Sequence, residues 1–379
     1  MRQLLTTADF RAEARRRIPR AIFDYADGGS FAEQTLQRNA ADLDALQFRQ
    51  RVMEDVSKIG TATTLLGCQA SLPLAIAPTG LAGLFHADGE ILGARAAATL
   101  GIPFCLSTMS ICSIEDVRAA TPQPFWFQQY LMRDRGFNRE LIERASAAQC
   151  SALMLTVDLQ VLGVRNRDVR NGLTIPPRLT LRNVVDVCSK PAWALGVLLG
   201  RRRSFGNLAG HLGHSGGAAA LARWTADQFD ASVTWRDVEW VRNQWPGKFI
   251  LKGILDVDDA LQALTMGADA IVVSNHGGRQ LDGAPSSISA LPRIVEAVSG
   301  RCEVLFDGGI RSGQDIAKAV ALGARGAMIG KAWLYALAAQ GQAGVSRLLD
   351  LFAQELRFTL AMTGTTDIKN AGRHILHGY

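Results

Sequence analysis

Short apolar segments recur eight times along this chain of 379 residues, and most are followed by a segment with helical periodicity. The eight segments are LPLAIAP (72–78), FCLST (104–108), FWFQQY (125–130), ALMLTVD (152–158), FILKG (249–253), AIVVSN (270–275), EVLFDGG (303–309) and AMIGK (327–331). Uninterrupted apolar strands are typical of a parallel sheet that is buried on both faces. Eight strands alternating with helices predict an α/β fold, a (β/α)8 barrel, with an open doubly wound sheet as the competing architecture.

Two segments fall outside this repeat. Residues 1–71 precede the first predicted strand and have mostly helical patterns, and the barrel is expected over residues 72–379. Residues 159–248 separate the fourth and fifth strands, far more than a usual loop of about 2–6 residues. The stretch 233–245 is the expected helix of the fourth strand, which leaves 159–232 as an insertion. We expect one domain over 1–379, with the insertion as a lid or binding segment.

Composition narrows the class of protein. Hydrophobic residues make up 48% and charged residues 20% of the chain, which is ordinary globular composition and excludes disorder, collagen and coiled coils. The six cysteines are scattered without Cys-x-x-Cys spacing, so we expect reduced thiols and neither a disulfide framework nor a metal site. The N-terminus has no apolar core of the kind found in signal peptides. No stretch approaches the roughly 20 apolar residues of a membrane-spanning helix.

The net charge of +6 is concentrated in one part of the chain. Between Leu159 and Gly217, nine Lys or Arg residues oppose two Asp residues, so this segment carries +7 and the rest is near −1. No nucleic-acid-binding motif accompanies the charge, and we expect no nucleic-acid partner. WALGVLLGRRR (193–203) places apolar residues beside three arginines, which predicts contact with a membrane surface. A solvated lid over the active site is the alternative.

Polar residues stand at the C-terminal ends of seven of the eight predicted strands, where chemistry lies in barrels of this kind. Two of these ends carry glycines next to a cation, since Gly308 and Gly309 precede Arg311, and Gly330 precedes Lys331. Glycines expose backbone N–H groups and the cation balances charge, so these ends predict a phosphate site. No G-x-G-x-x-G follows an opening strand, which argues against a nicotinamide site of the Rossmann type.

The most specific motif is SNHGGRQLDGAPSS (274–287), after the sixth strand. His276 and Arg279 flank two glycines, which let the backbone bend tightly and turn both side chains inward. A histidine is the natural base near neutral pH, and an arginine binds a carboxylate in bidentate fashion. Asp158, after the fourth strand, is placed to stabilise the imidazolium. The three residues suit removal of a proton from a hydroxyl group next to a carboxylate.

The chain resembles the family of FMN-dependent L-2-hydroxy acid dehydrogenases and oxidases over nearly its whole length. The shared motifs are FDYADGG (23–29), WFQQY, TVD, LKGILD (251–256), SNHGGRQLDG, DGGIR and GKAWLYALAAQGQAG (330–344). SNHGGRQLDG is specific to the family, whereas the glycine turns alone are not. The resemblance implies a TIM barrel that carries FMN, in agreement with the fold predicted from the strand pattern.

The resemblance also implies residue roles. His276 matches the general base and Asp158 its partner, while Arg279 and Arg165 match the arginines that bind the substrate carboxylate. Tyr25 and Tyr130 match tyrosines that contact substrate, and Lys252 matches the lysine beside flavin N1 and C2=O. The remaining flavin-contact positions are Ala77, Pro78, Thr79, Ser107, Gln128, Thr156 and Ser274. The ribityl and phosphate positions are Asp307, Gly308, Gly309, Arg311, Gly330 and Lys331.

Two departures from the family pattern bear on function. Members usually have Arg where this chain has Lys331, and lysine keeps the charge but loses the planar fork. Glycolate-oxidising members have Ala and Trp where this chain has Gly80 and Met109. The smaller glycine and flexible methionine leave room above the flavin as part of the substrate site, which disfavours glycolate as the sole substrate. Dehydrogenases of the family also have Gly at the first position.

The expected activity is oxidation of an L-2-hydroxy acid to the 2-oxo acid, most simply L-lactate to pyruvate, with electrons passed to a membrane quinone or similar acceptor. LGHSGG (212–217) and 229–245 favour lactate, whereas NGLTIPPRLTLRN (171–183) resembles the mandelate branch. The alternatives are (S)-mandelate or another bulky hydroxy acid, an oxygen-using oxidase that releases hydrogen peroxide, and a non-catalytic flavin-binding protein. We expect a homo-oligomer, with a tetramer considered. It is expected on the cytoplasmic side of the inner membrane, with a soluble cytoplasmic protein as the alternative.

Overall fold

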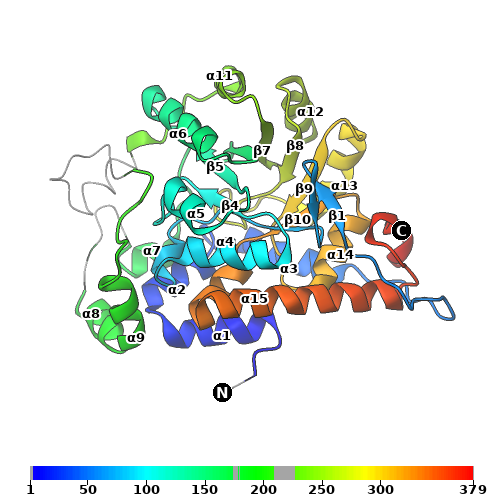
Figure 1. The fold of residues 1–379 in the computed structure, drawn as a ribbon, viewed down its shortest axis with the longest axis horizontal. Coiled ribbons are helices and arrows are strands. Elements are labelled where there is room, and N and C mark those ends of the chain that lie inside the picture. Colours follow the sequence, from blue (N-terminus) through cyan, green and yellow to red (C-terminus); the bar gives the residue numbers. More distant parts are fainter. Residues whose placement is uncertain (1–2, 174–177, 179, 209–226, 379) are drawn as a thin grey trace.

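A computed structural model describes residues 3–173, 178, 180–208 and 227–378. Eight parallel strands form one sheet in the order β3-β10-β9-β8-β7-β6-β5-β4. A parallel bridge between Ile76 and Phe104 joins β3 to β4, so the sheet closes into a barrel (Figure 1). The strands are β3 (Leu74–Ile76), β4 (Cys105–Ser107), β5 (Trp126–Tyr130), β6 (Ala152–Thr156), β7 (Lys248–Ile254), β8 (Ala270–Val273), β9 (Glu303–Asp307) and β10 (Gly326–Ile329). All eight coincide with the segments predicted from the sequence, although β7 extends one residue beyond its segment at each end and β10 begins one residue earlier.

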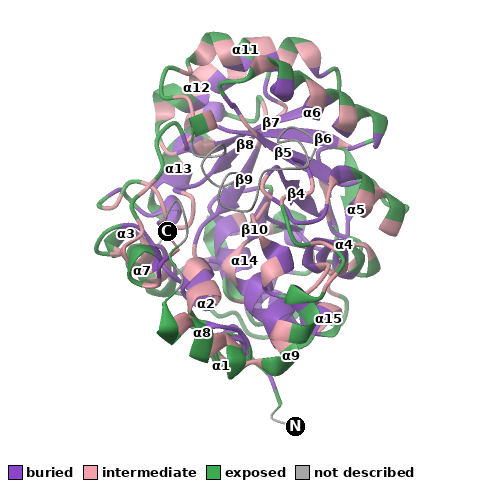
Figure 2. Cartoon of the chain, turned by 90° about the vertical axis from the view of Figure 1, so that its left-hand side faces the viewer, coloured by how far each residue is buried: buried purple, intermediate pink, exposed green. Residues whose placement is uncertain are grey.

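Helices surround the barrel and expose their outer faces, while the strands at the centre are buried (Figure 2). They are α4 (Gly89–Leu100), α5 (Ile114–Ala120), α6 (Arg135–Ala147), α11 (Trp235–Gln244), α12 (Val257–Thr265), α13 (Ser287–Val298), α14 (Gly313–Ala321) and α15 (Lys331–Met362). Side-chain caps fix several starts, as at Ser113 of α5 and Ser312 of α14. Helix α6 begins at Arg135, because Asp134 caps it through the Phe137 N–H.

The strands are mainly apolar because each contributes to two cores. One core fills the barrel and includes Met154, Ile250, Val272 and Met328. The other lies between the strands and the surrounding helices and includes Phe127 and many further buried side chains. A strand buried on both faces has no polar side of its own, which explains the continuous apolar segments in the sequence.

The N-terminal extension is only partly helical. Helices α1 (Thr7–Arg17), α2 (Arg20–Asp27) and α3 (Gln34–Ala45) agree with the predicted pattern, but β1 (Thr63–Leu65) and β2 (Cys68–Ala70) form a hairpin. Leu65 and Leu66 at its turn join the core inside the barrel. The hairpin therefore closes the N-terminal end of the barrel, opposite the ends that carry the polar residues.

Helix α15 packs along α1 and α4 and is interrupted at Gln340 and Gly341, which have non-helical backbone angles. Figure 1 shows it as the long orange helix below the barrel. The chain ends in two short 3₁₀ helices, η3 (Ile368–Asn370) and η4 (Arg373–Ile375). A third, η1 (Ala82–Leu84), follows β3.

The insertion after β6 contains α7 (Asn166–Arg170), α8 (Leu181–Cys188), α9 (Pro191–Trp193) and the π-helix η2 (Ala194–Leu198). Parts of the predicted insertion 159–232 lie outside the described residues, and so do LGHSGG (212–217) and part of 171–183. Helix α11 returns the chain to the barrel as the sequence predicts. Among the residues that the structure describes, no helix combines the length and apolarity needed to cross a bilayer.

Candidate active site

His276 and Asp158 meet at the mouth of the barrel. His276 follows β8 and Asp158 follows β6, and His276 Nδ1 lies 3.0 Å from Asp158 Oδ1. His276 has a left-handed backbone φ of 58°, and its N–H donates to Ser274 Oγ at 3.1 Å. Only 18% of the His276 side chain is exposed. Its second ring nitrogen, Nε2, forms no hydrogen bond within the described part of the chain.

The pair holds a neutral imidazole next to a carboxylate. Burial lowers the pKa of His276 because it disfavours the imidazolium, and this outweighs the attraction of Asp158. Burial raises the pKa of Asp158, but His276 and Lys252 together outweigh it and the net shift is downward. A neutral imidazole can accept a proton, and the adjacent carboxylate then stabilises the cation that forms.

Gly253 on β7 makes space for this pair. A Cβ built on Gly253 would lie 2.5 Å from Asp158 Cγ, and the backbone there has a φ of 107°. Both observations require a residue without a side chain. Gly253 was not predicted as a site residue, although its position in LKGILD, directly after Lys252, was a signal.

Lys252 is almost fully buried and is held by two oxygens. Its Nζ lies 2.8 Å from Asp307 Oδ2 and donates to Ser274 Oγ at 2.9 Å, while Ser274 Oγ donates to Asp307 Oδ2 at 3.0 Å. Burial lowers the pKa of Lys252, but the carboxylates of Asp307 and Asp158 outweigh it and the net pKa is raised. A buried positive charge is therefore fixed at the ends of β7, β8 and β9.

Two arginines face the ring of Tyr25 on α2. The guanidinium carbon of Arg279 lies 4.9 Å from the ring centroid and that of Arg165 lies 5.8 Å from it. Arg279 Nη1 donates to Tyr25 O at 2.5 Å and to Gly28 O at 3.0 Å. Burial and the nearby Arg165 lower the pKa of Arg279 to about 10. The N-terminal extension thus contributes one wall of the site.

Gly80 and Met109 lie against each other beside Tyr25. A Cβ on Gly80 would lie 3.0 Å from Met109 Cβ and 3.6 Å from the Tyr25 hydroxyl oxygen. Tyr130, at the end of β5, packs edge-on against Phe229, with ring centroids 5.9 Å apart. Burial raises the pKa of the Tyr130 hydroxyl well above its usual value, so it stays protonated. The structure places all of these residues around the barrel mouth.

Several buried polar atoms at the predicted flavin positions have no hydrogen-bond partner among the described residues. They are Thr79 Oγ1 after β3, Gln128 Nε2 within β5 and Thr156 Oγ1 at the end of β6. Ser107 Oγ donates to Gln128 Oε1 at 3.0 Å, which fixes the amide with its nitrogen free. Buried polar groups are rarely left unpaired in native proteins, so these atoms fit a bound molecule with its own donors and acceptors. The residues present therefore fit the flavin that the sequence implies. Ala77 and Pro78 precede Thr79 in the same loop.

The predicted phosphate position is built from backbone. Gly308 and Gly309 have φ values of 114° and 95°, and Gly330 precedes the first turn of α15. Arg311 lies nearby and is half-exposed, with Nη2 3.6 Å from Asp44 Oδ2. The Nζ of Lys331 donates to Ala26 O at 2.5 Å and to Gly28 O at 2.8 Å. In this structure its charge lies against the C-terminus of α2, so the phosphate role stays a prediction.

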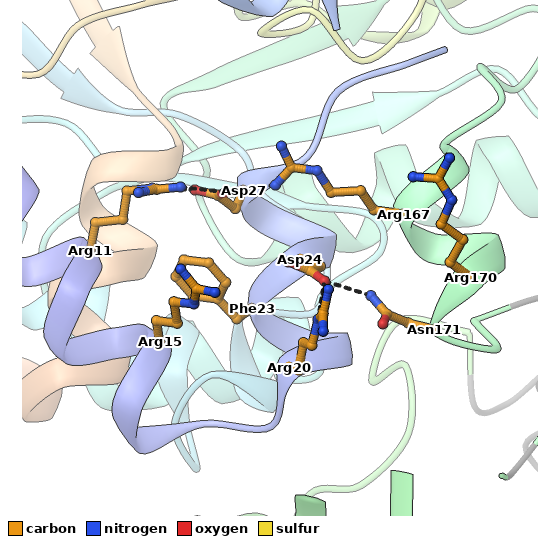
Figure 3. A pocket seen from close by; sticks show the side chains of 9 residues that line it. All are labelled: Arg11, Arg15, Arg20, Phe23, Asp24, Asp27, Arg167, Arg170 and Asn171. Carbon is orange, nitrogen blue, oxygen red and sulfur yellow. Dashed lines mark hydrogen bonds and ion pairs between the residues drawn. The ribbon is translucent and has the colours of Figure 1, made fainter. Parts of the chain in front are cut away.

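Two carboxylates of α2, Asp24 and Asp27, line a pocket of about 220 Å³ together with five arginines (Figure 3). Asp27 pairs with Arg11 at 2.5 Å and with Arg167 at 2.8 Å. Asp24 accepts from Arg20 at 3.2 Å and from Asn171 at 2.8 Å. The network ties α1 and α7 to the helix that carries Tyr25. No sequence motif indicated it, because its members lie in three separate segments.

A second missed feature anchors α3 to the catalytic loop. Asn39 Nδ2 donates to Asn275 Oδ1 at 2.8 Å, and Asn275 Nδ2 donates to Asn39 Oδ1 at 2.7 Å. Asn275 precedes His276, so this reciprocal pair fixes the backbone next to the base. The position of Asn275 inside SNHGG was a signal, whereas nothing in the sequence pointed to Asn39. Among the described residues, no group of three or more His, Cys, Asp or Glu side chains is placed to hold a metal ion.

Comparisons with known proteins agree with this site. The model of the family of FMN-dependent dehydrogenases matches residues 14–378. The chain is 50% identical over 372 residues to the L-lactate dehydrogenase of Caulobacter sp. (strain K31), covering 98% of each. It is 47% identical over 371 residues to the L-lactate dehydrogenase of Stenotrophomonas maltophilia (strain R551-3), again covering 98% of each.

Two solved structures have the same fold. The monotopic membrane protein (S)-mandelate dehydrogenase superposes with a TM-score of 0.95 at 35% identity, with 100% of both chains covered. Mandelate oxidase superposes with a TM-score of 0.84 at 40% identity, with 98% of both covered. Fold and site together define a flavin-dependent oxidoreductase. The chain belongs to the family of FMN-dependent dehydrogenases and its cofactor is FMN, which confirms the barrel and the cofactor predicted from the sequence.

Proposed function

We propose that the protein oxidises an L-2-hydroxy acid to the 2-oxo acid, with L-lactate, which gives pyruvate, as its main substrate. The observation that carries the proposal is the His276–Asp158 pair, 3.0 Å apart, at the same barrel mouth as Arg165 and Arg279. The His276–Asp158 pair is suited to accept a proton from a hydroxyl group, and the two arginines are suited to bind a carboxylate. A 2-hydroxy acid carries a hydroxyl group and a carboxylate on adjacent carbons.

The protein groups have separate tasks in this proposal. Arg165 and Arg279 bind the substrate carboxylate and orient the hydroxyl group toward His276. His276 Nε2 accepts the hydroxyl proton, and Asp158 stabilises the imidazolium. The buried charge of Lys252 favours negative charge at the ends of β7 to β9. Bound FMN supplies the acceptor for two electrons and the α-hydrogen.

Two candidate substrates differ in the size of the side chain that the site must accept. Relatives at about 50% identity are named L-lactate dehydrogenase, which favours a small side chain. The second candidate is (S)-mandelate or another bulky acid, and the absence of a side chain at Gly80, which lies against Met109, favours it. Anaerobic bleaching of the flavin with L-lactate, (S)-mandelate and glycolate ranks them by kcat/KM. Failure of every 2-hydroxy acid to bleach the flavin would contradict the proposed function.

The proposed electron acceptor is a membrane quinone or a similar molecule, with oxygen as the alternative. The yield of hydrogen peroxide per oxidised substrate, compared with the yield of reduced quinone analogue, separates a dehydrogenase from an oxidase. A peroxide yield near one per turnover in the presence of quinone would contradict a dehydrogenase. The expected homo-oligomer stays a prediction, and light scattering of the holoprotein tests it.

We also propose that the protein binds a membrane surface through α8 and the α9–η2 segment, which lie next to each other at the lower left of Figure 1. The (S)-mandelate dehydrogenase with the same fold is described as a monotopic membrane protein. No residue of α8 is buried. The exposed apolar side chains of the two segments are Leu181, Val184, Val185, Leu195, Leu198 and Leu199. Exposed apolar residues gathered on one surface favour an interaction site.

Two residues of the predicted membrane segment have other roles. The indole Nε1 of Trp193 donates to Leu84 O at 2.6 Å, which holds the segment to the barrel. Arg202 pairs with Asp88 and with Asp116, both at 2.7 Å. The guanidinium of Arg202 is therefore engaged with the protein. Arg201 and Arg203 are exposed and are the proposed contacts for lipid headgroups, with Arg203 Nε also donating to Gly200 O at 2.7 Å.

Flotation with vesicles of phosphatidylcholine and phosphatidylglycerol tests the proposal. R201S/R203S is expected to weaken binding steeply at low salt, since each arginine is worth about 1 kcal/mol near an anionic surface. R236S/R293S removes the same charge from exposed positions on α11 and α13 and is expected to bind like wild type. L195S/L198S/L199S removes the apolar contact. If wild type never floats at low salt, the segment is only a lid. The cytoplasmic face stays a prediction, which protease protection of inverted vesicles tests.

A further inference from the structure

A buried carboxylate on α4 joins the two loops that carry Gly80 and Met109. Glu90 is 1% exposed, and its Oε1 accepts from the N–H of Gly83 at 3.1 Å and from that of Ile111 at 2.9 Å. Its Oε2 accepts a longer bond from the Cys112 N–H at 3.4 Å. Gly83 belongs to the loop after β3, and Ile111 and Cys112 belong to the loop after β4.

These bonds lie close to the contact between Gly80 and Met109. Met109 O accepts from the Leu81 N–H at 2.8 Å, so the two loops are also joined one residue from Gly80. A Cβ on Gly80 would lie only 3.0 Å from Met109 Cβ. The separation of Gly80 from Met109 is therefore restrained by this backbone bond and, two to three residues further along each loop, by the Glu90 carboxylate.

Burying the carboxyl group of Glu90 between the two loops costs free energy. Within the described part of the chain no Lys or Arg forms an ion pair with it, so backbone N–H groups and the Cys112 side chain compensate for its burial. Burial raises the pKa of Glu90, and the backbone donors oppose the shift. Three backbone donors from two loops converge on this one carboxyl group, which suits a fixed loop geometry.

We propose that Glu90 is a positioning residue that sets the width of the pocket for the substrate side chain. It acts through the Gly80 and Met109 loops and contacts neither the substrate carboxylate nor the base. The inference rests on the proposed function in one respect, since it takes the hydroxy acid to bind against Gly80 and Met109.

The insertion holds the same loop from the outside. Asn207 is 1% exposed, and its Nδ2 donates to Ser107 O at 3.3 Å and Ser110 Oγ at 3.0 Å. Its Oδ1 accepts from the Ile114 N–H at 2.9 Å. With the Met109 loop fixed by Asn207, loss of the Glu90 bonds frees mainly the side that faces Gly80. The pocket is then expected to widen, so a small substrate loses contacts and a bulky one does not.

The test compares E90A and E90Q with D269A. Asp269 accepts from the Phe249 N–H at 2.9 Å at the opposite end of the barrel, so its loss reproduces a broken backbone contact away from the pocket. The readouts are KM and the limiting rate of anaerobic flavin bleaching with L-lactate and (S)-mandelate, together with Tm. E90A is expected to raise the mandelate to lactate ratio of kcat/KM at least about fivefold through the KM for lactate, with limiting rates changed less than about threefold.

E90Q keeps one acceptor oxygen for Gly83 and Ile111, so about a threefold shift in the same direction is expected, and this variant decides the matter if E90A does not fold. D269A is expected to lower Tm and leave the ratio unchanged. A ratio within about 1.5-fold of wild type in E90A and E90Q overturns the proposal, and so does an equal shift in D269A.

If no hydroxy acid bleaches the flavin of the wild-type protein, the proposed function is refuted, but the role of Glu90 in holding the two loops together is not. Amide hydrogen exchange then decides on Glu90. Exchange must accelerate at residues 80–83 and 109–112 in E90A and stay unchanged there in D269A. Unchanged exchange in E90A overturns the inference.

Discussion

A Cβ on Gly253 would lie 2.5 Å from the Cγ of Asp158, so strand β7 accommodates the partner of His276 only because position 253 has no side chain. Gly253→Ala is therefore expected to displace Asp158 and reduce turnover by roughly 10²-fold or more, since a base that loses its orienting partner loses most of its effect. The limiting rate of flavin bleaching measures this.

Gly283→Ala is the matched control for Gly253→Ala. Gly283 also has a positive φ, of 88°, but a Cβ there would meet nothing within 4 Å. It is expected to lose about 1 kcal/mol of stability from backbone strain and to keep its turnover. Equal activity in the two variants would show that Asp158 tolerates displacement.

The activity is expected to fall at acid pH with the protonation of His276. Burial lowers the pKa of His276, so the acid limb of kcat/KM should lie below the usual histidine value of about 6.5. Asp158 raises that pKa, so Asp158→Asn should move the limb to lower pH while reducing the rate. His276→Gln should lower turnover by roughly 10²–10⁴ with the flavin still bound. The acid limb of kcat/KM that is due to protonation of His276 should then be absent.

Substrate size is expected to depend on position 80. Gly80→Ala places a methyl group 3.0 Å from Met109 Cβ and 3.6 Å from the Tyr25 hydroxyl oxygen. Overpacking costs about 1–3 kcal/mol, and the added methyl occupies the space proposed for the substrate side chain. Bulky acids should therefore be lost before L-lactate. An unchanged ratio of mandelate to lactate activity would place Gly80 outside the pocket.

Stability is expected to depend on pH through Asp27. Burial raises the pKa of Asp27, but hydrogen bonds from Arg11 and Tyr335 outweigh it and lower the pKa to about 2. A folded pKa below the unfolded value stabilises the protein above about pH 4, and this stabilisation is lost as the pH falls through about 2. Asp27→Asn should cost about 2 kcal/mol at pH 7 and progressively less below pH 4. Thermal unfolding tests this, with exposed Asp350→Asn as the control; a pH-independent difference would contradict the ion pairing.

The barrel was predictable because strands buried on both faces leave continuous apolar segments, and all eight became strands. The β1–β2 hairpin was not, since its strands have three residues each and β2 exposes Cys68 and Gln69. Short, partly exposed strands carry neither an apolar run nor a clear alternation.

The candidate site divides in the same way. The side chains at strand ends could be predicted, because parallel strands bring their C-terminal ends together whatever the intervening loops do. The partners of Lys331 and Arg202 could not, because a cation gives no sign in sequence of which distant carbonyl or carboxylate it will meet. The role of Glu90 could not be predicted either, since its partners are backbone N–H groups, which leave no sign in the sequence.

The reciprocal bonds between Asn39 and Asn275 have a consequence for synthesis of the chain on the ribosome. The two residues are 236 positions apart. At about 5–20 residues per second, α3 waits on the order of 10–50 s after translation for the loop that receives it. A nascent chain released before that loop contains Tyr25 and Asp158 but has no partner for Asn39. The N-terminal wall of the active site is thus completed late in translation.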